Sequence, residues 1–296
     1  MSHTLIVYLH GIGDNIMLTG VLKEYCRQHP EERIDLVVLN PGCAAIWKNN
    51  PLVNSVTVYP GTQPYFWNPA KFYLLHQWRV RRFIHQLNQD VRYERVLFPT
   101  IQTLPEIIYH LTGAYGRHKI ERLSHDMGVS AKLYPYDLHT TAEDAVRAKE
   151  LSARLAGTRL AVLHPFSGHA KKRISNNGFG KILEALRQGG LATLVVGAPE
   201  EKSRLDPNWK TESAFGLSFG VLIEVLKRAE IFAGTDSAIA HLAAFANTPH
   251  IVILSPKLEP RRYLPVSENA RISLIHIRKN HEPENLAEFS TVLTAR

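Results

Sequence analysis

The chain has 296 residues, of which 45% are hydrophobic and 21% charged, a balance that excludes extensive disorder and is typical of a soluble globular protein with one large or two ordinary domains. Lysine and arginine exceed aspartate and glutamate by 35 − 27 = 8, so we expect anionic partners such as sugar nucleotides or acidic lipid headgroups, while no zinc-finger or RNA-recognition signature supports nucleic acid. Because no apolar run approaches the roughly 20 residues of a membrane span, the first residues lack the basic start of a signal peptide, and Cys26 and Cys43 show no metal-binding spacing, we expect a cytoplasmic protein.

Short apolar strands alternate with helix-length segments along the chain, a pattern typical of βα units and a parallel sheet. In the first half this pattern predicts strands near residues 5–10, 34–39, 55–59 and 94–98. It predicts helices near residues 15–28, 42–49, 71–88 and 103–113.

The first predicted strand runs into the turn "LIVYLHGIGDNIMLTG" (5–20), which matches a dinucleotide-binding turn only in part. Gly11 and Gly13 fit such a turn, but Ile16 stands where it needs a third glycine, and Asp14 would repel phosphates. Two interpretations of Asp14 are open. It is a general base presented at the carboxyl end of a strand, or it is the N-cap of the following helix.

The helix predicted at 71–88 carries the sequence "KFYLLHQWRVRRFIHQL", which mixes arginines with aromatic residues. Such a helix can lie against an anionic membrane surface. An ordinary amphipathic helix with a solvated basic face is the commoner explanation of the same pattern. Both interpretations stay open, peripheral contact with the inner face of the membrane and a solvated helix.

The polar stretch 137–157 predicts a linker that contains a helix begun by a Thr141-x-x-Asp144 capping box. A second series of βα units follows, with strands near 159–165, 192–199, 231–235 and 250–256 and helices near 176–188, 218–229 and 237–246. The simplest architecture is an α/β fold of two Rossmann-like domains that face each other across a cleft, residues 1–142 and residues 143–296.

The segment "AGTDSAIAHLAAFANTPHIVILSP" (233–256) carries the strongest signal for a site. A buried strand ends at Thr235, and Asp236 and Ser237 are predicted to cap a helix rich in small residues. The first amides of that helix, with the hydroxyl of Thr235 or Ser237, can receive a diphosphate. His241 lies one turn further on nearly the same face, although a packed histidine is the commoner explanation of such a position.

The loop "HPFSGHAKKR" (164–173) follows the first predicted strand of the second half. It carries His164, Ser167 and Gly168, and then three cations, Lys171, Lys172 and Arg173. These cations can neutralise a leaving diphosphate at the same sheet edge as Thr235. A solvated basic loop is the alternative. The chain contains no Asp-x-Asp, no His-Glu-x-x-His and no cysteine cluster, so we expect no metal and no cofactor.

Three motifs in the order "GIGDNIMLTGVLKEY", "HPFSGHAKKR" and "AGTDSAIAHLAAFANTPHIVILSP" resemble glycosyltransferase family 9, the lipopolysaccharide heptosyltransferases. The resemblance implies a GT-B fold, with an acceptor-binding first domain and a nucleotide-sugar-binding second domain. It implies inverting transfer of a sugar, typically heptose from ADP-heptose, to a lipopolysaccharide-core or other glycan or glycolipid acceptor. By this match Asp14 is the general base and Lys172 contacts the phosphates. The candidate substrate-binding residues are Gly13, His164, Ser167, Gly168, Arg173, Thr235, Asp236, Ser237, Ala238 and His241.

Several positions depart from the family pattern. Ile174 replaces a tryptophan, Gly20 stands in place of a proline, Ala238 in place of a glycine, and Glu259 in "SPKLEP" lies near the position of an aspartate. These changes indicate a divergent branch whose sugar need not be heptose. A nucleotide-sugar epimerase or hydrolase of the same fold and a non-catalytic nucleotide-sugar-binding protein remain as alternatives, whereas a nicotinamide dehydrogenase fails at Ile16.

Overall fold

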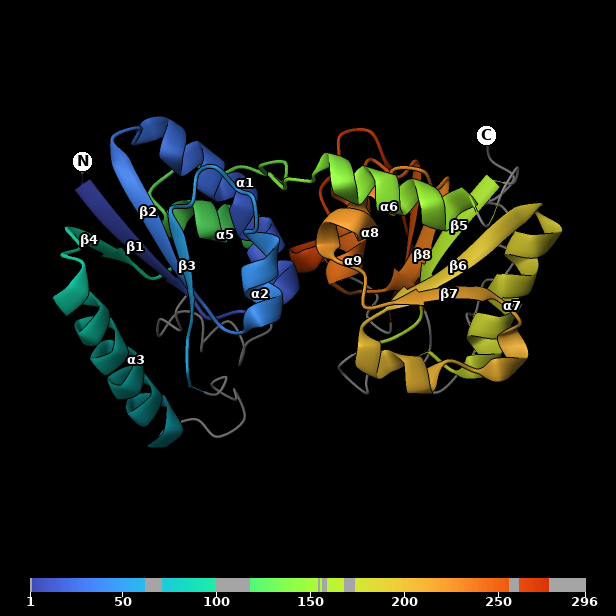
Figure 1. Cartoon of the computed structure of the whole chain (residues 1–296), viewed down its shortest axis with the longest axis horizontal. Helices are drawn as coiled ribbons and strands as arrows, with labels where there is room; N and C mark the ends of the chain where they lie inside the picture. Colours follow the sequence, from blue (N-terminus) through green and yellow to red (C-terminus); the bar gives the residue numbers. More distant parts are fainter. Residues whose placement is uncertain are drawn as a thin grey trace. The chain divides into compact units, whose positions relative to one another are not determined.

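The computed structural model describes residues 2–61, 71–99, 118–153, 155, 159–167, 174–255 and 261–276. The chain divides into two compact units, residues 1–134 and residues 135–296 (Figure 1). Each unit contains one sheet in which all described pairings are parallel, so the expected α/β fold is confirmed. Among the described residues, no helix is long and apolar enough to cross a membrane.

The first unit is a four-stranded sheet in the order β3-β2-β1-β4 with helices packed around it. Its described elements are β1 (Ser2–Tyr8), α1 (Ile12–Gln28), β2 (Glu32–Val38), α2 (Pro41–Ile46), β3 (Ser55–Val58), α3 (Lys71–Asp90), β4 (Arg95–Leu97) and α5 (Lys119–Asp126). All four strands predicted here are present, and the helix predicted at 103–113 lies outside the described residues. The first half of α1 is enclosed, because residues 15–22 are all buried.

The second unit is a six-stranded sheet in the order β10-β9-β8-β5-β6-β7. Its helices and strands are α6 (Ala142–Ala153), β5 (Arg159–His164), α7 (Asn176–Gln188), β6 (Leu191–Gly197), β7 (Glu212–Phe215), α8 (Phe219–Leu226), β8 (Ile231–Thr235), α9 (Ala238–Phe245), β9 (His250–Ser255) and β10 (Arg271–His276). Three short 3-10 turns are described as well, η2 (Pro199–Arg204), η3 (Pro207–Trp209) and η4 (Arg261–Tyr263). Within this unit the first strand, β5, lies beside the fourth, β8, which is the order of a Rossmann sheet.

The helix predicted in the 137–157 stretch is α6, and it begins as expected. Thr141 N–H donates to Asp144 Oδ2 at 3.0 Å, and Asp144 N–H donates to Thr141 Oγ1 at 3.2 Å. The helix packs against α8, where Ser218 Oγ donates to Asp144 Oδ1 at 3.2 Å and Thr140 Oγ1 donates to Glu224 Oε1 at 2.7 Å. This segment is therefore part of the packing of the second unit.

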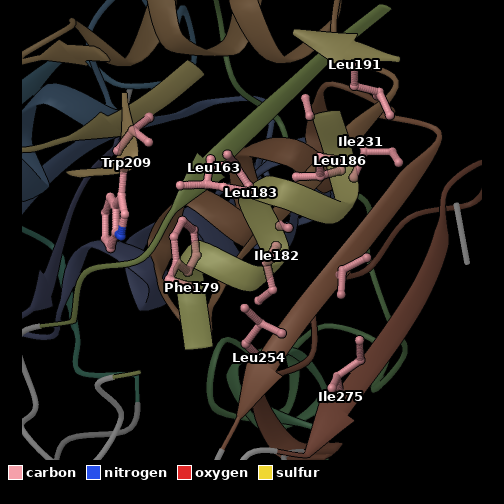
Figure 2. Packing of buried hydrophobic residues seen from close by; sticks show 14 of the residues in the cluster. Leu163, Phe179, Ile182, Leu183, Leu186, Leu191, Trp209, Ile231, Leu254 and Ile275 are labelled. Atoms are coloured by element: carbon pink, nitrogen blue, oxygen red, sulfur yellow. The ribbon is translucent and has the colours of Figure 1, made fainter. Parts of the chain in front are cut away.

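Figure 2 shows the core of the second unit, where α7 packs on the sheet. Phe179, Ile182, Leu183 and Leu186 recur at helical spacing along α7 and are all buried. They meet side chains of β5, β8 and β9, among them Leu163, Ile231 and Leu254. Each such side chain contributes about 1.5–3 kcal/mol on burial, so this contact fixes the strands whose carboxyl ends carry the candidate site.

Candidate functional site

The candidate site of the second unit lies where the strand order reverses, at β5 and β8. His164 is the last residue of β5 and is aligned with Gly234 of β8, and Thr235 is the last residue of β8. In open α/β sheets, ligands bind outside the carboxyl ends of the strands at such a point. The fold therefore places two of the predicted site residues where a ligand is expected.

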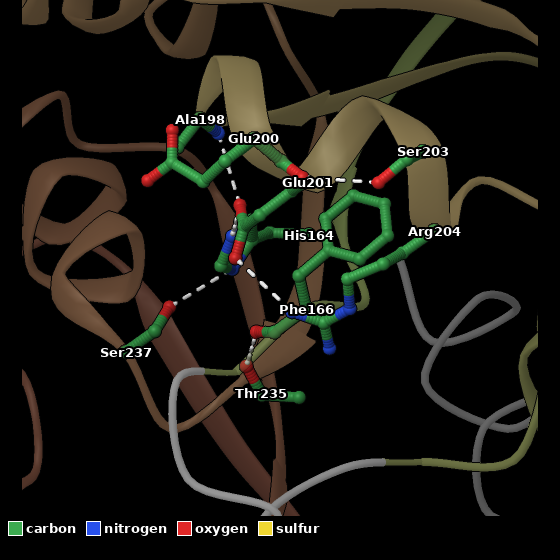
Figure 3. Close-up of polar contacts among 9 residues, drawn as sticks. All are labelled: His164, Phe166, Ala198, Glu200, Glu201, Ser203, Arg204, Thr235 and Ser237. Atoms are coloured by element: carbon green, nitrogen blue, oxygen red, sulfur yellow. Dashed lines mark hydrogen bonds and ion pairs between the residues drawn. The ribbon is translucent and has the colours of Figure 1, made fainter.

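His164 joins two other loops of this edge (Figure 3). His164 Nδ1 lies 3.1 Å from Ser237 Oγ, just before α9, and His164 Nε2 lies 3.3 Å from Glu201 Oε2 on η2. Glu201 was missed in the sequence, although the acidic pair in "GAPEE" directly after a predicted strand is a signal for it. The carboxyl ends of β5, β6 and β8 thus share one polar cluster, His164, Glu201 and Ser237.

Glu201 is held as a carboxylate within this cluster. Burial alone would raise its pKa, but hydrogen bonds from His164 and from Ala198 N–H at 2.9 Å, with the positive charge of Arg204, together lower the pKa of Glu201 below its ordinary value. Because a carboxylate can only accept, His164 donates through Nε2. In the imidazole form that carries a hydrogen on Nε2 alone, Nδ1 accepts the hydrogen of the Ser237 hydroxyl.

Two glycines allow the cluster to form. A Cβ on Gly234 would lie 2.7 Å from His164 O and 2.8 Å from Phe232 Cζ, and one on Gly197 would lie 2.9 Å from Glu201 Oε2. Both distances at Gly234 and the one at Gly197 are shorter than real Cβ contacts. Glycine at position 234 therefore lets β8 approach the backbone of β5, and glycine at position 197 leaves room for the Glu201 carboxylate over the end of β6.

The two hydroxyls that we expected to face a diphosphate, those of Thr235 and Ser237, make different hydrogen bonds. Thr235 is 0% exposed, and its Oγ1 donates to Phe166 O at 2.6 Å, so it holds the loop that follows β5. Ser237 is the N-cap residue of α9, but its side chain makes no capping bond and lies on His164 instead. The prediction that side chains cap this helix is therefore wrong for Ser237, because its hydroxyl is hydrogen-bonded to the imidazole of His164.

The other predicted residues of the second unit lie near these two. Asp236, Ser237 and Ala238 are partly exposed between β8 and the first turn of α9, and Ser167 is buried directly after β5. His241 is 3% exposed, and its Nδ1 lies 2.7 Å from Tyr136 Oη, a partner that the sequence did not reveal. Outside the described residues lie Gly168, Lys171, Lys172, Arg173 and Glu259.

In the first unit, Asp14 does not cap α1. The helix begins at Ile12 with Gly11 as its N-cap, so Gly13 and Asp14 are the second and third helical residues and the predicted start at residue 15 was too late. The reason is that the extended Gly11 already turns the chain into the helix, with φ −68° and ψ 174°. Asp14 lies in the first turn, where the helix dipole favours a negative charge.

A buried lysine accompanies Asp14. Lys119 Nζ lies 3.9 Å from Asp14 Oδ1, and the two side chains are 2% and 24% exposed. Lys119 is fixed at the first position of α5, since Ile120 N–H donates to His118 Nδ1 at 3.1 Å and His118 N–H donates to Glu121 Oε2 at 2.9 Å. No local sequence pattern pointed to this partner, because Lys119 comes from an element far along the chain.

Asn15 holds the turn that presents Asp14. Its side-chain amide donates to His10 O at 3.2 Å and to Gly11 O at 3.0 Å, and its Oδ1 accepts from Trp47 Nε1 at 3.0 Å. Asn15 is fully buried, so these bonds tie the end of β1, the start of α1 and α2 together. The carboxylate of Asp14 is thus presented from a rigid turn.

Within the described part of the chain, no group of three or more His, Cys, Asp or Glu side chains is arranged to hold a metal ion. The polar groups that the structure brings together are the Asp14 carboxylate and buried Lys119 in the first unit. In the second unit they are the Glu201 carboxylate, the His164 imidazole and the Ser237 hydroxyl.

Comparison with known proteins tests the family resemblance of the sequence motifs. The sequence model of glycosyltransferase family 9 (heptosyltransferase) matches residues 113–292. The chain is similar to lipopolysaccharide heptosyltransferase 3 of Escherichia coli K12, with 23% identity over 273 residues that cover 81% of this chain and 78% of that protein.

Two solved structures share the fold along nearly the whole chain. The glycosyl transferase family 9 protein of Veillonella parvula DSM 2008 has a TM-score of 0.74 at 15% identity and covers 100% of this chain and 98% of its own. The ADP-heptose lps heptosyltransferase II of E. coli has a TM-score of 0.69 at 15% identity and covers 99% of each chain. The resemblance carried by the three sequence motifs is confirmed.

Proposed function

The chain belongs to glycosyltransferase family 9, the heptosyltransferase family, and we propose that it transfers heptose or a related sugar from ADP-heptose or a similar nucleotide sugar to a lipopolysaccharide-core or other glycan acceptor. The observation that carries the proposal is the cluster of His164, Glu201 and Ser237 at the carboxyl ends of β5, β6 and β8. The names of two relatives, an ADP-heptose heptosyltransferase and a lipopolysaccharide heptosyltransferase, support the choice of donor and acceptor.

We assign donor binding to the second unit. Its cluster lies at the point of a Rossmann sheet where nucleotides bind, and the side chain of Ser237, the N-cap residue of α9, makes no capping bond there. Helix N-terminal amides attract phosphate groups. The loop that contains Lys172 and Arg173 adds positive charge in the sequence directly after β5, which suits a leaving diphosphate.

We assign the base of the reaction to Asp14 in the first unit. In a single displacement, Asp14 accepts the proton of an acceptor hydroxyl while the oxygen bonds to the anomeric carbon, and the bond to the nucleoside diphosphate breaks on the opposite face. The configuration at that carbon is inverted. The rigid turn built by Asn15 supports this role, because a base must be held in place to act, and Lys119 lies beside its carboxylate. No metal ion takes part in this scheme.

A panel of nucleotides tests the donor assignment. Thermal unfolding is followed with ADP, UDP, GDP, dTDP and NAD and with the available sugar conjugates, all at one concentration, because a ligand present at 100 times its dissociation constant stabilises by roughly 2.7 kcal/mol and a weaker ligand stabilises less. We expect one nucleoside diphosphate to raise the melting temperature, and its sugar conjugate to raise it further. A shift with NAD alone, or none with any nucleotide, contradicts the proposal.

The same panel separates transfer from the two alternatives. Each nucleotide sugar that binds is incubated without acceptor, and the products are separated by chromatography. We expect the donor to stay intact until a lipopolysaccharide-core acceptor is added. Release of free sugar or formation of an isomer without acceptor identifies a hydrolase or an epimerase instead, and an intact donor with every acceptor identifies a binding protein.

We further propose that α3 touches the inner face of the membrane. Trp78 is 55% exposed, and Arg82 Cζ lies 5.6 Å from the centre of its ring. Arg79 and Arg81 are exposed beside them, whereas Val80 and Ile84 are buried four residues apart and form the inner side of the helix. Cosedimentation with vesicles tests this contact: binding to anionic but not to zwitterionic vesicles supports it, and equal recovery in both supernatants refutes it.

A further inference from the structure

The polar cluster at the carboxyl ends of β5, β6 and β8 joins a carboxylate, an imidazole and a hydroxyl in that order. Glu201 Oε2 lies 3.3 Å from His164 Nε2, and His164 Nδ1 lies 3.1 Å from Ser237 Oγ (Figure 3). The three residues come from three separate segments, η2, β5 and the turn before α9. An acid, an imidazole and a serine linked in this order are the groups of a catalytic triad, which recurs on unrelated folds.

The cluster is closed to water at one end and open at the other. His164 is 5% exposed, and the side chain of Glu201 is 14% exposed. Ser237 is half-buried at the carboxyl edge of the sheet. The hydroxyl is therefore the member of the cluster that a substrate can reach, with the imidazole behind it, as a serine nucleophile and its base require.

Glu201 sets the imidazole to receive a proton from the serine. A carboxylate oxygen can only accept, so His164 Nε2 donates to Glu201 Oε2. The same oxygen accepts from Ala198 N–H at 2.9 Å, which fixes its place over the end of β6. With its hydrogen on Nε2, the neutral imidazole presents the lone pair of Nδ1 to the Ser237 hydroxyl.

Ser237 differs from two other serines that begin helices of the second unit. Ser175 and Ser218 are the N-cap residues of α7 and α8, and their hydroxyls accept from Gly178 N–H at 3.0 Å and from Val221 N–H at 3.2 Å. The side chain of Ser237, the N-cap residue of α9, makes no capping bond and meets an imidazole instead. Its hydroxyl is thus placed beside a base, which helix capping does not require.

We propose that Ser237 is a nucleophile activated by His164, with Glu201 as the positioning residue, and that this site hydrolyses simple carboxylic esters. Ser237 Oγ bonds to the carbonyl carbon while its proton passes to His164 Nδ1, and the departing alcohol takes that proton as its bond to the acyl carbon breaks. Water then gives a proton to Nδ1, bonds to the acyl carbon and releases the carboxylic acid, and the serine oxygen takes this proton back. The reaction needs neither a nucleotide nor a sugar acceptor, so it is an activity beyond sugar transfer.

An organophosphorus fluoride tests the nucleophile in the unmodified chain. In the expected reaction the Ser237 oxygen bonds to phosphorus, the phosphorus–fluorine bond breaks, fluoride leaves and the serine proton goes to His164. Mass spectrometry of the peptides then locates the label. We expect Ser237 to be labelled much faster than Ser218, although Ser218 is the more exposed of the two. No labelling of Ser237, or equal rates for the two serines, overturns the proposal.

Hydrolysis of p-nitrophenyl acetate measures the activity itself. We expect Ser237→Ala and His164→Gln each to lower the protein-dependent rate by roughly 10²- to 10⁴-fold, the usual contribution of a positioned base. Ser218→Ala is the matched control and should keep the full rate. Where His164→Gln does not fold, Ser237→Ala decides the case, because it removes only a half-buried hydroxyl. An unchanged rate in Ser237→Ala overturns ester hydrolysis at this site.

The pH profile of labelling tests the role of Glu201. In the unmodified chain the rate should rise with pH as the imidazole loses its second proton, because only the neutral form accepts the serine proton. In Glu201→Gln the rise should occur at lower pH, since the neutral amide no longer stabilises the protonated imidazole, and the rate above it should be lower. A profile with an unchanged midpoint refutes the positioning role of Glu201.

The result does not depend on the proposed function, because labelling is measured without nucleotide. A nucleoside diphosphate that binds should slow the labelling of Ser237, since the proposed donor site includes this residue. Rapid labelling of Ser237 that no nucleotide slows supports the activated serine and contradicts the donor assignment. Nucleotide binding without any labelling of Ser237 supports the donor assignment and overturns the activated serine.

Discussion

Replacing Gly234 by alanine tests how closely β8 must approach β5. The new Cβ would lie 2.7 Å from His164 O, which is a backbone atom of the paired strand, and 2.8 Å from Phe232 Cζ. The carbonyl cannot move aside without disturbing the pairing of His164 with Gly234. Overpacking of this kind costs about 1–3 kcal/mol. In a unit of this size 1 kcal/mol corresponds to roughly 2–4 °C, so we expect the melting temperature to fall by about 2–12 °C.

Gly180→Ala is the matched control for this substitution. Gly180 lies inside α7, and its Cβ would lie 3.7 Å from Trp209 Nε1, which is an ordinary contact. Alanine in a helix interior is favoured over glycine by about 0.5–1 kcal/mol, so this variant should be as stable as the unmodified chain or slightly more stable.

Thermal and urea unfolding followed by circular dichroism compare the two variants, and nucleotide titration of the folded proteins follows. Because His164 is the residue displaced, Gly234→Ala should also bind the nucleoside diphosphate more weakly, whereas Gly180→Ala should bind it normally. A Gly234→Ala protein with unchanged stability and unchanged affinity would refute the close approach of β8 and β5 as the basis of the site.

Three further substitutions follow from the ion pairs and caps. The pKa of Glu201 is lowered in the folded state, so its contribution to stability is present above the ordinary glutamate pKa of about 4.3 and is lost as the pH falls through the lower folded value. In urea unfolding, Glu201→Gln should therefore have a smaller free energy of unfolding than the unmodified chain at pH 7, and this difference should disappear in acid. A difference that does not change with pH contradicts this. Thr141→Ala removes the cap of α6 and should reduce the free energy of unfolding by about 0.5–2 kcal/mol, and an unchanged urea midpoint would show that the cap is not needed. Lys119→Met removes the cation beside Asp14, so steady-state kinetics should show a lower kcat with unchanged donor affinity, and a loss of donor affinity alone would disprove the link to Asp14.

The sequence predicted the central strands of both sheets and the edge strands of the first sheet, but not the edge strands of the second. Strands β1, β5, β8 and β9 are buried apolar runs bounded by turn residues, which is a strong local signal. The two edge strands of the second sheet, β7 and β10, were missed. β7 has only four residues, two of them exposed, and β10 is mostly half-buried, so neither shows a continuous apolar run.

The site was predictable only where its residues follow strands. His164 ends β5, Ser237 lies two residues after β8, and Asp14 lies in the first turn of α1, the helix that follows β1. Their partners Glu201 and Lys119 come from other elements, and no local pattern links them. The start of α1 was misplaced because Asp14 is an ordinary N-cap residue, whereas the extended Gly11 that begins the helix has no side chain to indicate it.

The most direct test of the account is the turnover of Asp14→Asn against the unmodified chain, measured as nucleoside diphosphate released from the donor identified in the nucleotide panel, with a lipopolysaccharide-core acceptor and with EDTA present. We expect the unmodified chain to turn over in EDTA, and Asp14→Asn to lose about 10²- to 10⁴-fold in kcat while it binds the donor with unchanged affinity. Near-normal turnover of Asp14→Asn, or loss of all activity of the unmodified chain in EDTA, would contradict a metal-independent transfer with Asp14 as the base.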